Sequence, residues 1–378
     1  MAAVRKVLIV GGGPAGLCAA IVLGRNGIEV EIAEISQDLR PQGVGIAVVG
    51  PSVRALAAVD PELLDQCIEA GAAHRTMSFG GADGKITRRV ELPQPLGARF
   101  PGGFGIRRRV LWELLAVAAQ QAGAKIRLTT TVDAIRQEGD RVEASLSDGS
   151  VVSCDLLIGA DGLWSKVREL AFGGAAEPAY SGQVAWRAMV SRTAETDDGV
   201  IVYTGQKGRI GCNPVSADEM YIFSGANSAE PARAPREEWP ALMREFLTGY
   251  GGAIERVIDQ VTDPDRIDCR SLYGLLVRPP WYRGRVLLIG DAVHAPTPQL
   301  GMGAGIAVED AVVLGQVLSG ADDVDGALAR FMERRYERCR MVVENSLQLS
   351  EWDKNPGDPQ ADPAGLSDAT FTAMAAPF

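Results

Sequence analysis

The sequence predicts an α/β fold in which a parallel sheet carries an inserted domain of antiparallel strands, with a long helix near the C-terminus. Residues 4–10 form a continuous branched apolar run, followed by a predicted helix at 14–25 and a second strand at 27–33. From about residue 180 to residue 223, short strand-like runs replace this β-α alternation and indicate an antiparallel sheet. A helical pattern over residues 325–350 predicts the long helix.

The remaining elements follow from apolar periodicity and turn signals. Helices are predicted at residues 53–59, 61–70, 109–122, 236–250 and 253–261. Strands are predicted at residues 125–130, 134–138, 141–146, 151–154, 184–190, 199–204, 210–214, 220–224 and 285–289. A hairpin turn is expected at residues 147–150. Residues 353–378 are rich in Pro, Asp, Ala and Gly, which predicts a partly mobile tail.

The bulk properties exclude several classes of protein. The chain has 378 residues, with 46% hydrophobic and 23% charged side chains, as is typical of a globular protein. A net charge of −10 argues against a nucleic-acid partner or an anionic membrane surface. Six cysteines without close pairs suit a reducing cytoplasm, and two histidines are too few for a multi-histidine metal centre. No apolar run is long enough to predict a membrane span.

The turn after the first strand has the pattern G-x-G-x-x-G, with Gly11, Gly13 and Gly16. The first glycine permits the tight turn, the second lets a pyrophosphate approach the backbone, and the third allows close helix–strand packing. Glu34 ends the second strand, where a carboxylate accepts hydrogen bonds from ribose hydroxyls and repels a 2′-phosphate. The pattern favours FAD or NAD over NADP at this site, against the alternative of a glycine-rich turn without a ligand.

Two further strand-and-loop motifs follow in a set order. Asp161-Gly162 comes after a buried strand, within the sequence CDLLIGADGLWSKVR. Gly290-Asp291 lies in RVLLIGDAVHAPTPQLGMGAGIAVED, at residues 285–310. Taken alone, each motif is equally well explained as a strand-to-helix turn.

With the N-terminal segment, these motifs resemble the single-component FAD-dependent aromatic hydroxylases of the p-hydroxybenzoate hydroxylase type, along nearly the whole chain. The region 180–224 is most similar to FAD-dependent urate hydroxylases and related heteroaromatic hydroxylases. The resemblance implies a Rossmann-like FAD-binding domain of the glutathione-reductase type, formed by residues 1–72, 103–175 and 270–352. Residues 73–102 and 176–269 would form the inserted substrate-binding domain.

The resemblance also implies which residues meet FAD. Asp291 would bond the ribityl chain, Pro298 would lie beside the reactive edge of the flavin, and Arg108 would meet the phosphates. For Arg108 the alternative is a basic surface cluster with Arg107 and Arg109. The full expected set is Gly11, Gly13, Pro14, Ala15, Gly16, Glu34, Gly45, Ile46, Arg108, Val132, Asp161, Gly162, Gly290, Asp291, Pro298, Gly301, Gly303 and Ala304.

Some positions depart from the family or are expected to play no catalytic part. The family often has Gln at the position of Met302 and Asn at that of Gly305, so only backbone contacts to the flavin are expected there. His294 is expected to be structural.

The implied reaction uses NADH or NADPH as a transient reductant and O₂, and passes through a flavin C4a-hydroperoxide to hydroxylate a small electron-rich aromatic or heteroaromatic ring. Arg209 and Tyr221 match substrate-binding positions of the urate enzymes, whereas Arg187 departs from them. Together with Pro298, Arg209 and Tyr221 are the expected catalytic residues. Strand position alone suggests as substrate contacts Trp186, Arg187, Tyr203, Arg209, Cys212, Tyr221 and Phe223.

Two other functions stay open at this point. One is a flavoprotein reductase or another FAD-dependent oxidoreductase on the same scaffold, and the other is a non-catalytic flavin-binding sensor. A halogenase is disfavoured because the chain lacks W-x-W-x-I-P. A second G-x-G-x-x-G unit after a strand is also lacking, so the nicotinamide is expected to bind only transiently. We expect no metal, a cytoplasmic location, and a monomer or homodimer.

Overall fold

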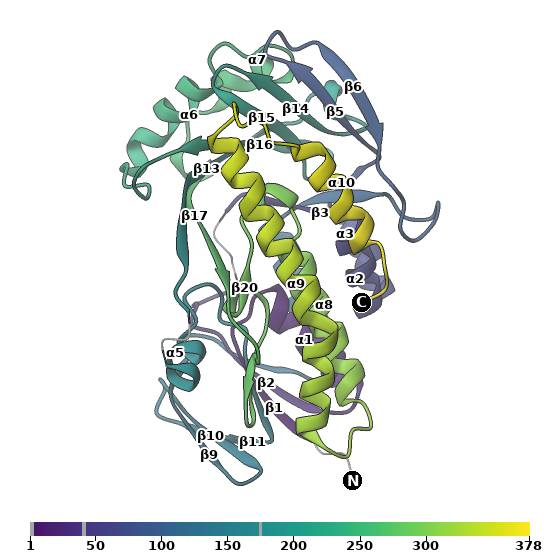
Figure 1. The fold of residues 1–378 in the computed structure, drawn as a ribbon, viewed down its shortest axis with the longest axis vertical. Helices are drawn as coiled ribbons and strands as arrows, with labels where there is room; N and C mark the ends of the chain where they lie inside the picture. Colours follow the sequence, from purple (N-terminus) through teal and green to yellow (C-terminus); the bar gives the residue numbers. More distant parts are fainter. Residues whose placement is uncertain (1–3, 40–42, 174–175) are drawn as a thin grey trace.

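The computed structural model describes residues 4–39, 43–173 and 176–378. The lower half of Figure 1 contains a mainly parallel sheet with the strand order β18-β19-β12-β1-β2-β8. Branched apolar side chains fill its central strands, which are covered on both faces, as buried parallel strands require. The bounds are β1 (Lys6–Val10), β2 (Glu29–Ala33), β8 (Lys125–Arg127), β12 (Leu156–Gly159), β18 (Tyr282–Arg283) and β19 (Val286–Leu288).

Helices from both ends of the chain pack together beside this sheet. Helix α1 (Pro14–Arg25) contacts α8 (Gly303–Leu318), which in turn contacts the long helix α9 (Val324–Lys354). Helix α1 also contacts α4 (Arg108–Gln121), and α8 contacts α2 (Pro51–Val59). Helix α8 is buried along nearly its whole length, so α1 and α9 complete one core with it.

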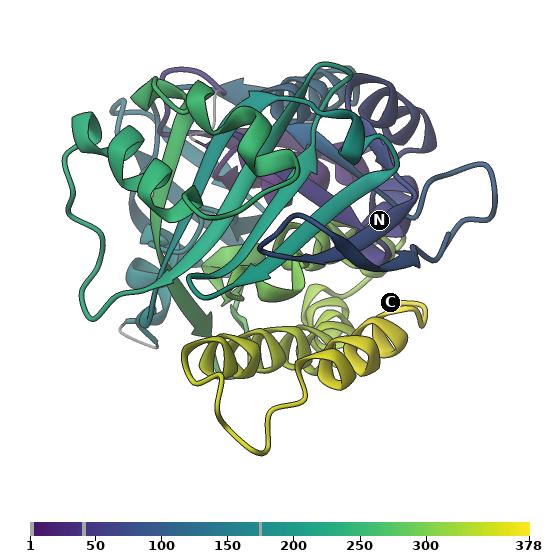
Figure 2. The same ribbon diagram turned by 90° about the horizontal axis from the view of Figure 1, so that it is seen from above.

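A second sheet fills the upper half of Figure 1, in the order β20-β17-β13-β16-β15-β14-β5-β6. Its neighbouring strands are antiparallel except for the parallel pair β14–β5. The bounds are β5 (Thr76–Gly81), β6 (Ile86–Glu91), β13 (Ala179–Ser191), β14 (Gly199–Gly205), β15 (Gly208–Pro214), β16 (Glu219–Asn227), β17 (Ile267–Leu276) and β20 (His294–Ala295). Helices α6 (Trp239–Leu247) and α7 (Ala253–Val257) cover its outer face (Figures 1 and 2).

Two small sheets and the remaining helices complete the fold. The small sheets have the orders β11-β10-β9 and β3-β7-β4. Their strands are β3 (Gly45–Val49), β4 (Ala72–His74), β7 (Gly103–Arg107), β9 (Val132–Glu138), β10 (Arg141–Leu146) and β11 (Val151–Cys154). The remaining helices are α3 (Pro61–Ala70), α5 (Lys166–Phe172) and α10 (Pro363–Met374). Short 3-10 turns lie at Ala194–Thr196, Arg236–Glu238, Ile258–Gln260, Pro264–Arg266, Gly290–Ala292 and Pro298–Leu300.

The predicted fold class is confirmed: a parallel sheet, an antiparallel sheet and a long helix near the C-terminus are all present. Three details differ. Strands β3 to β7, β17, β18 and β20 were not predicted: β3, β5 and β7 contain glycine, and β4, β18 and β20 have three residues or fewer. Strand β17 continues the second sheet past the expected domain boundary at 269/270, and the boundaries themselves stay a prediction. The expected mobile tail contains α10, which packs against α9. Among the described residues, no helix is long and apolar enough to cross a membrane.

Candidate active site

The turn between β1 and α1 has the shape that the glycine pattern predicts. Gly11 has φ +108°, and a Cβ placed on it would lie 2.3 Å from the carbonyl oxygen of Ala160. A Cβ on Gly16 would lie 2.0 Å from the carbonyl oxygen of Gly11. A Cβ on Gly13 would meet no described atom within 4 Å, and no described side chain caps α1 at this residue. The free N–H groups of the α1 N-terminus therefore face open space that suits a phosphate.

A cavity of about 290 Å³ opens beside this turn. It brings together five of the predicted residues: Gly11, Gly13, Glu34, Asp161 and Gly162. The other residues that line it are Val10, Gly12, Ala33, Ile35, Ser36, Asp38, Leu39, Trp112, Thr131 and Ala160. Trp112 and Thr131 were not predicted to line this cavity; Trp112 reaches it from α4, and Thr131 directly precedes β9. In the sequence, the only indication of such a role is that Trp112 follows the predicted Arg108 by four residues and that Thr131 directly precedes the predicted Val132.

Glu34 is oriented by the backbone around it. One carboxylate oxygen accepts the N–H of Gly12 at 2.5 Å, and the other accepts the N–H of Ser36 at 2.8 Å. Each carboxylate oxygen has a further lone pair, so ribose hydroxyls could still be bound at the edge of the cavity. The glycine turn, the open helix N-terminus and this acid fit the adenosine and pyrophosphate portion of FAD.

Asp161 has a structural task besides lining the cavity. Its carboxylate accepts a hydrogen bond from the hydroxyl of Ser165 at 2.5 Å and from the N–H of Val167 at 3.0 Å, at the start of α5. Burial raises the pKa of Asp161, and these hydrogen bonds act in the opposite direction. Val132 is fully buried, so its side chain packs in the core while the neighbouring Thr131 lines the cavity.

The Gly290-Asp291 turn lies next to the N-terminus of α1. A Cβ on Gly290, which has φ +60°, would lie 2.9 Å from the Cβ of Ala15. Asp291 is exposed. The surrounding protein nevertheless removes part of the solvation of its carboxylate, which raises its pKa, while the charges of His294 and Arg108 act to lower it. The N–H of Gly290 donates to the carboxylate of Asp310 at 2.9 Å. The turn is thus held from α8, which fixes the direction of Asp291.

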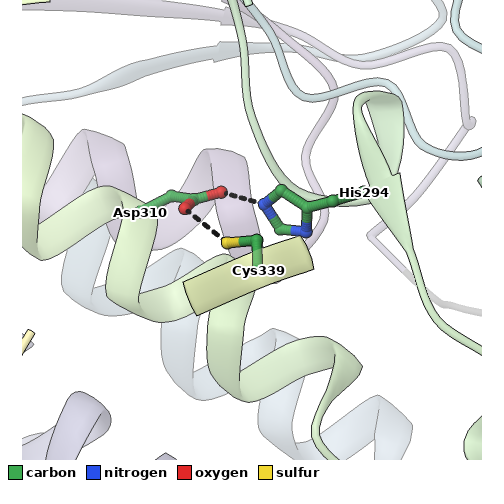
Figure 3. Close-up of side chains that lie close together, drawn as sticks. All are labelled: His294, Asp310 and Cys339. Atoms are coloured by element: carbon green, nitrogen blue, oxygen red, sulfur yellow. Dashed lines mark hydrogen bonds and ion pairs between the residues drawn. The ribbon is translucent and has the colours of Figure 1, made fainter. Parts of the chain in front are cut away.

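Asp310 is the centre of a buried polar network between α8 and α9 (Figure 3). Its carboxylate binds Nε2 of His294 at 2.6 Å and Nε of Arg335 at 2.7 Å, and Cys339 lies beside it. Burial lowers the pKa of His294, but Cys339 and Asp310 raise it, and the result is well above the ordinary value. Burial acts to raise the pKa of Asp310, but His294 and Arg335 bring it down to about 2.

The three side chains in Figure 3 also have the atom types of a metal site. The guanidinium of Arg335 donates to Asp310 and also lies 3.2 Å from Sγ of Cys339. A cation there would meet a buried positive charge, so this donor set does not suit a metal. Asp310 joins the Gly290 turn and His294 to α9 through its hydrogen bonds, and a structural role for His294 stays a prediction.

The loop from Pro298 leads into α8. Gly301 has φ +65°, and α8 begins at Gly303, so the helix N-terminus follows the loop directly. The structure explains the departure at position 305 and gives no reason for the one at position 302. Met302 is buried, and a Cβ on Gly305 would lie 1.9 Å from Oγ of Ser52 in α2. An asparagine at position 305 would therefore not fit this packing.

The second sheet separates the candidate substrate residues by face. Trp186, Tyr203 and Cys212 belong to the core under α6 and α7, where Trp186 packs against Trp239. These three side chains face away from the FAD-binding half and therefore do not reach the candidate site. Alternate residues point the other way because side chains alternate along a strand.

The inner face of this sheet meets β3 at Tyr221. A Cβ on Gly45 would lie 2.6 Å from the ring of Tyr221, whose centroid is 6.0 Å from that of Phe223. Burial raises the pKa of Tyr221, and Arg187 and Arg108 act to lower it. One region between the two halves of the molecule therefore contains Gly45, Ile46, Tyr221 and Phe223.

Arg108 and Arg209 lie in different surroundings. Arg108 begins α4 near Tyr221, Arg187 and Asp291, and it does not line the cavity beside Gly13. Arg209 is exposed and forms an ion pair with Asp353 at the end of α9. A substrate role for Arg209 would require that this pair open.

The sheet order, the glycine turn and the Gly290 loop define a flavin-dependent oxidoreductase fold. Residues 5–346 match the family model described as an FAD binding domain. The chain is 31% identical to a FAD-dependent urate hydroxylase of Mycolicibacterium vanbaalenii, over 89% of this chain and 86% of that protein. It is 30% identical to 2-heptyl-3-hydroxy-4(1H)-quinolone synthase of Pseudomonas aeruginosa, over 92% and 90%.

Solved structures agree with these relatives. HpxO of Klebsiella pneumoniae, crystallised with FAD and uric acid, is 25% identical and has a TM-score of 0.82, covering 98% of this chain and 92% of that one. A 2-methyl-3-hydroxypyridine-5-carboxylic acid oxygenase is 25% identical with a TM-score of 0.78, covering 98% of each chain. The protein belongs to the family of FAD-dependent monooxygenases that hydroxylate aromatic and heteroaromatic compounds.

Proposed function

We propose that this protein uses NADH or NADPH and O₂ to hydroxylate a small electron-rich aromatic or heteroaromatic ring. The observation that carries the proposal is the position of Tyr221, buried against Gly45 where the second sheet meets β3. The relatives that act on urate and on a hydroxypyridine carboxylic acid support a heteroaromatic ring. When bound, FAD would accept electrons from the nicotinamide and activate oxygen.

The residues of this chain would bind and orient the reactants. Gly13 and the α1 N-terminus would hold the pyrophosphate, Glu34 the ribose, and Asp291 the ribityl chain. The N-terminus of α8, after Pro298 and Gly301, would stabilise negative charge on the reduced flavin ring. Phe223 and the ring of Tyr221 would form an apolar wall that excludes water, and the Tyr221 hydroxyl would orient the substrate.

The remaining expected FAD contacts are backbone positions and Arg108. Pro14, Ala15 and Gly16 continue the glycine turn, and Gly162 follows Asp161. Gly303 and Ala304 begin α8, and Gly45 and Ile46 would lie alongside the flavin. Arg209 stays a prediction as a substrate residue, because Asp353 now pairs with it.

The test is NADH and NADPH oxidation by FAD-loaded protein with a panel of phenols, hydroxybenzoates, hydroxypyridines and purines. We expect one class to speed oxidation and to gain one oxygen by mass. Tyr221→Phe should lower product formed per nicotinamide oxidised, whereas Tyr250→Phe, whose hydroxyl bonds Gly208 away from the proposed site, should not. Bound FAD with nicotinamide oxidation but no oxygenated product would favour a reductase. Bound FAD without any nicotinamide oxidation would favour a sensor.

A further inference from the structure

Three arginines converge on the inner face of the second sheet, beside Tyr221. Arg187 and Arg270 come from the paired strands β13 and β17, and Arg108 comes from the start of α4. A Cβ on Gly43 would lie 3.2 Å from Cδ of Arg108 and 3.5 Å from Nη2 of Arg270. The side chains of Arg108 and Arg270 therefore both lie against Gly43, and the pairing of β13 with β17 places Arg187 on the same face of the sheet.

The carboxylate within this group is shared. Asp268 lies opposite Arg187 in the strand register and is 3.5 Å from its Nη1. The same carboxylate accepts both of its hydrogen bonds from Nε of Arg270, at 2.8 and 3.0 Å. Asp268 thus offsets the charge of one arginine, and Asp291, which interacts with Arg108, offsets part of a second, so the three guanidinium groups keep a positive excess.

Unused donors remain in the cluster. Nη2 of Arg270 is buried and has no hydrogen-bond partner in the described part of the chain. Burial, together with the like charges of Arg187 and Arg270, lowers the pKa of Arg108 to about 10. Buried guanidinium donors without partners are costly, so an arrangement of this kind is stable when an anion satisfies it.

We propose that Arg187 and Arg270, next to the proposed FAD contact Arg108, bind the carboxylate of a small aromatic or heteroaromatic acid. This inference rests on the proposed function and names its substrate class. A carboxylate is planar and accepts two parallel hydrogen bonds from a guanidinium, which fixes the direction of the attached ring. Tyr221 and Phe223 lie beside the cluster and would receive the ring.

The charges around each arginine explain why Arg187 and Arg270, and not Arg209, are assigned to the substrate carboxylate. Arg209 is exposed and its charge is met by Asp353. The side chain of Arg187 is 15% exposed and that of Arg270 is 38% exposed, and both share Asp268. An anion bound between Arg187 and the buried Nη2 of Arg270 would therefore be partly shielded from water, which strengthens a charged hydrogen bond.

The experiment measures ligand binding without turnover. FAD-loaded protein is titrated with matched ring compounds, 3-hydroxybenzoate against 3-hydroxybenzamide and 6-hydroxynicotinate against 6-hydroxynicotinamide, while flavin absorbance and fluorescence are followed. We expect the carboxylates to bind at least about tenfold more tightly than the amides. Arg270→Gln and Arg187→Gln should each remove most of this preference, and Arg270→Lys should restore part of it. Arg256→Gln, whose charge pairs with Glu195, should leave it unchanged.

Three results would overturn the proposal. They are equal binding of acid and amide, no carboxylate response at millimolar concentration, and a preference that survives both glutamine variants. Where the third result comes with weaker FAD binding, and the preference is measured at saturating FAD, the arginines would be assigned to the cofactor instead. The flavin-to-protein absorbance ratio separates this case from loss of folding. Because no oxygenated product is measured, failure here is distinct from failure of the proposed hydroxylation.

Discussion

Gly11 and Gly13 lie two residues apart, yet the structure requires each of them for a different reason. Gly11 is required by the fold, since its positive φ and the nearby Ala160 carbonyl exclude a side chain. Gly13 has φ −78° and open space around its Cβ position, so the fold itself tolerates alanine there. Packing therefore does not require the glycine at position 13, and we propose that a bound pyrophosphate does.

Gly13→Ala should leave the fold intact and weaken FAD binding by about tenfold or more, because a methyl group would occupy the space of the pyrophosphate. Circular dichroism and the thermal midpoint of the FAD-free protein check folding, and flavin fluorescence measures affinity. Gly357→Ala, in open space far along the chain, is the matched control. Unchanged FAD affinity in Gly13→Ala would contradict the assigned pyrophosphate position.

Residues whose role is set by local geometry could be identified from the sequence. The spacing of Gly11, Gly13 and Gly16 and the acid at Glu34 describe a turn that the chain builds with near neighbours. The cluster of Arg187, Arg270 and Asp268 could not be identified in this way, because it depends on the register of β13 against β17. The alternation along β13 did contain one usable signal, since it places Trp186 and Arg187 on opposite faces.

At the scale of elements, α8 is held by tight contacts with its neighbours. Gly305 packs against Ser52 of α2, and a Cβ on Gly315 would lie 2.1 Å from a methyl group of Val22 in α1. Small residues at these points let the three helices approach closely. The N-terminus of α8 is therefore fixed in position by packing that begins within its first turn.

Gly305→Ala should lower the free energy of unfolding by about 1–3 kcal/mol, because the new methyl group would overlap the Ser52 hydroxyl. Ser52→Gly removes that hydroxyl, so the double variant should recover part of the loss. Urea unfolding of the four FAD-free proteins measures the coupling. Gly303→Ala is the control, since the nearest described atom to its Cβ position is 3.4 Å away. Strictly additive effects would contradict the assigned contact.

Helix α10 shows where composition was misleading. Pro, Asp, Ala and Gly predicted a mobile tail, but Asp362 caps the helix by accepting the N–H of Gly365, and Pro363 begins it. This pairing is a known helix-start signal and was available in the sequence. The rest was not available: Arg338 on α9 and Arg54 on α2 donate to the carbonyl of Met374, which requires the tertiary structure.

At the scale of the whole molecule, we expect the stability of the fold to depend on pH near neutrality through the two histidines, His74 and His294. Both are fully buried and their shifts are opposite. Burial lowers the pKa of His74 to about 4, the hydrogen bond to Pro214 acts against this, and Arg192 acts with it. The pKa of His294 is instead raised by Cys339 and Asp310 against the effect of burial.

The two histidines should therefore affect stability in opposite directions. The neutral form of His74 stabilises the fold above its unfolded pKa of 6.5, and this contribution is lost as pH falls toward 4. Between about pH 7 and pH 5 the loss should be about 2 kcal/mol. The charged form of His294 contributes fully below pH 6.5 and loses its contribution as pH rises through its raised pKa.

Urea unfolding across this pH range, with His74→Gln and His294→Gln, checks the prediction. The wild type should lose its advantage over His74→Gln as pH falls, and its advantage over His294→Gln as pH rises. Parallel pH profiles for the two variants would show that the histidines do not carry these opposite shifts.

The packing of α1 against α8 also constrains the order in which the molecule can be assembled. Residues 14–25 emerge early from the ribosome, but their partner helix lies at residues 303–318. At roughly 5–20 residues per second, the apolar face of α1 waits for roughly 15–60 s before its partner is made. The Gly290 turn, which lies against Ala15, is synthesised equally late. FAD therefore meets a complete site only near the end of synthesis, and the apolar face of α1 lacks its native partner until then.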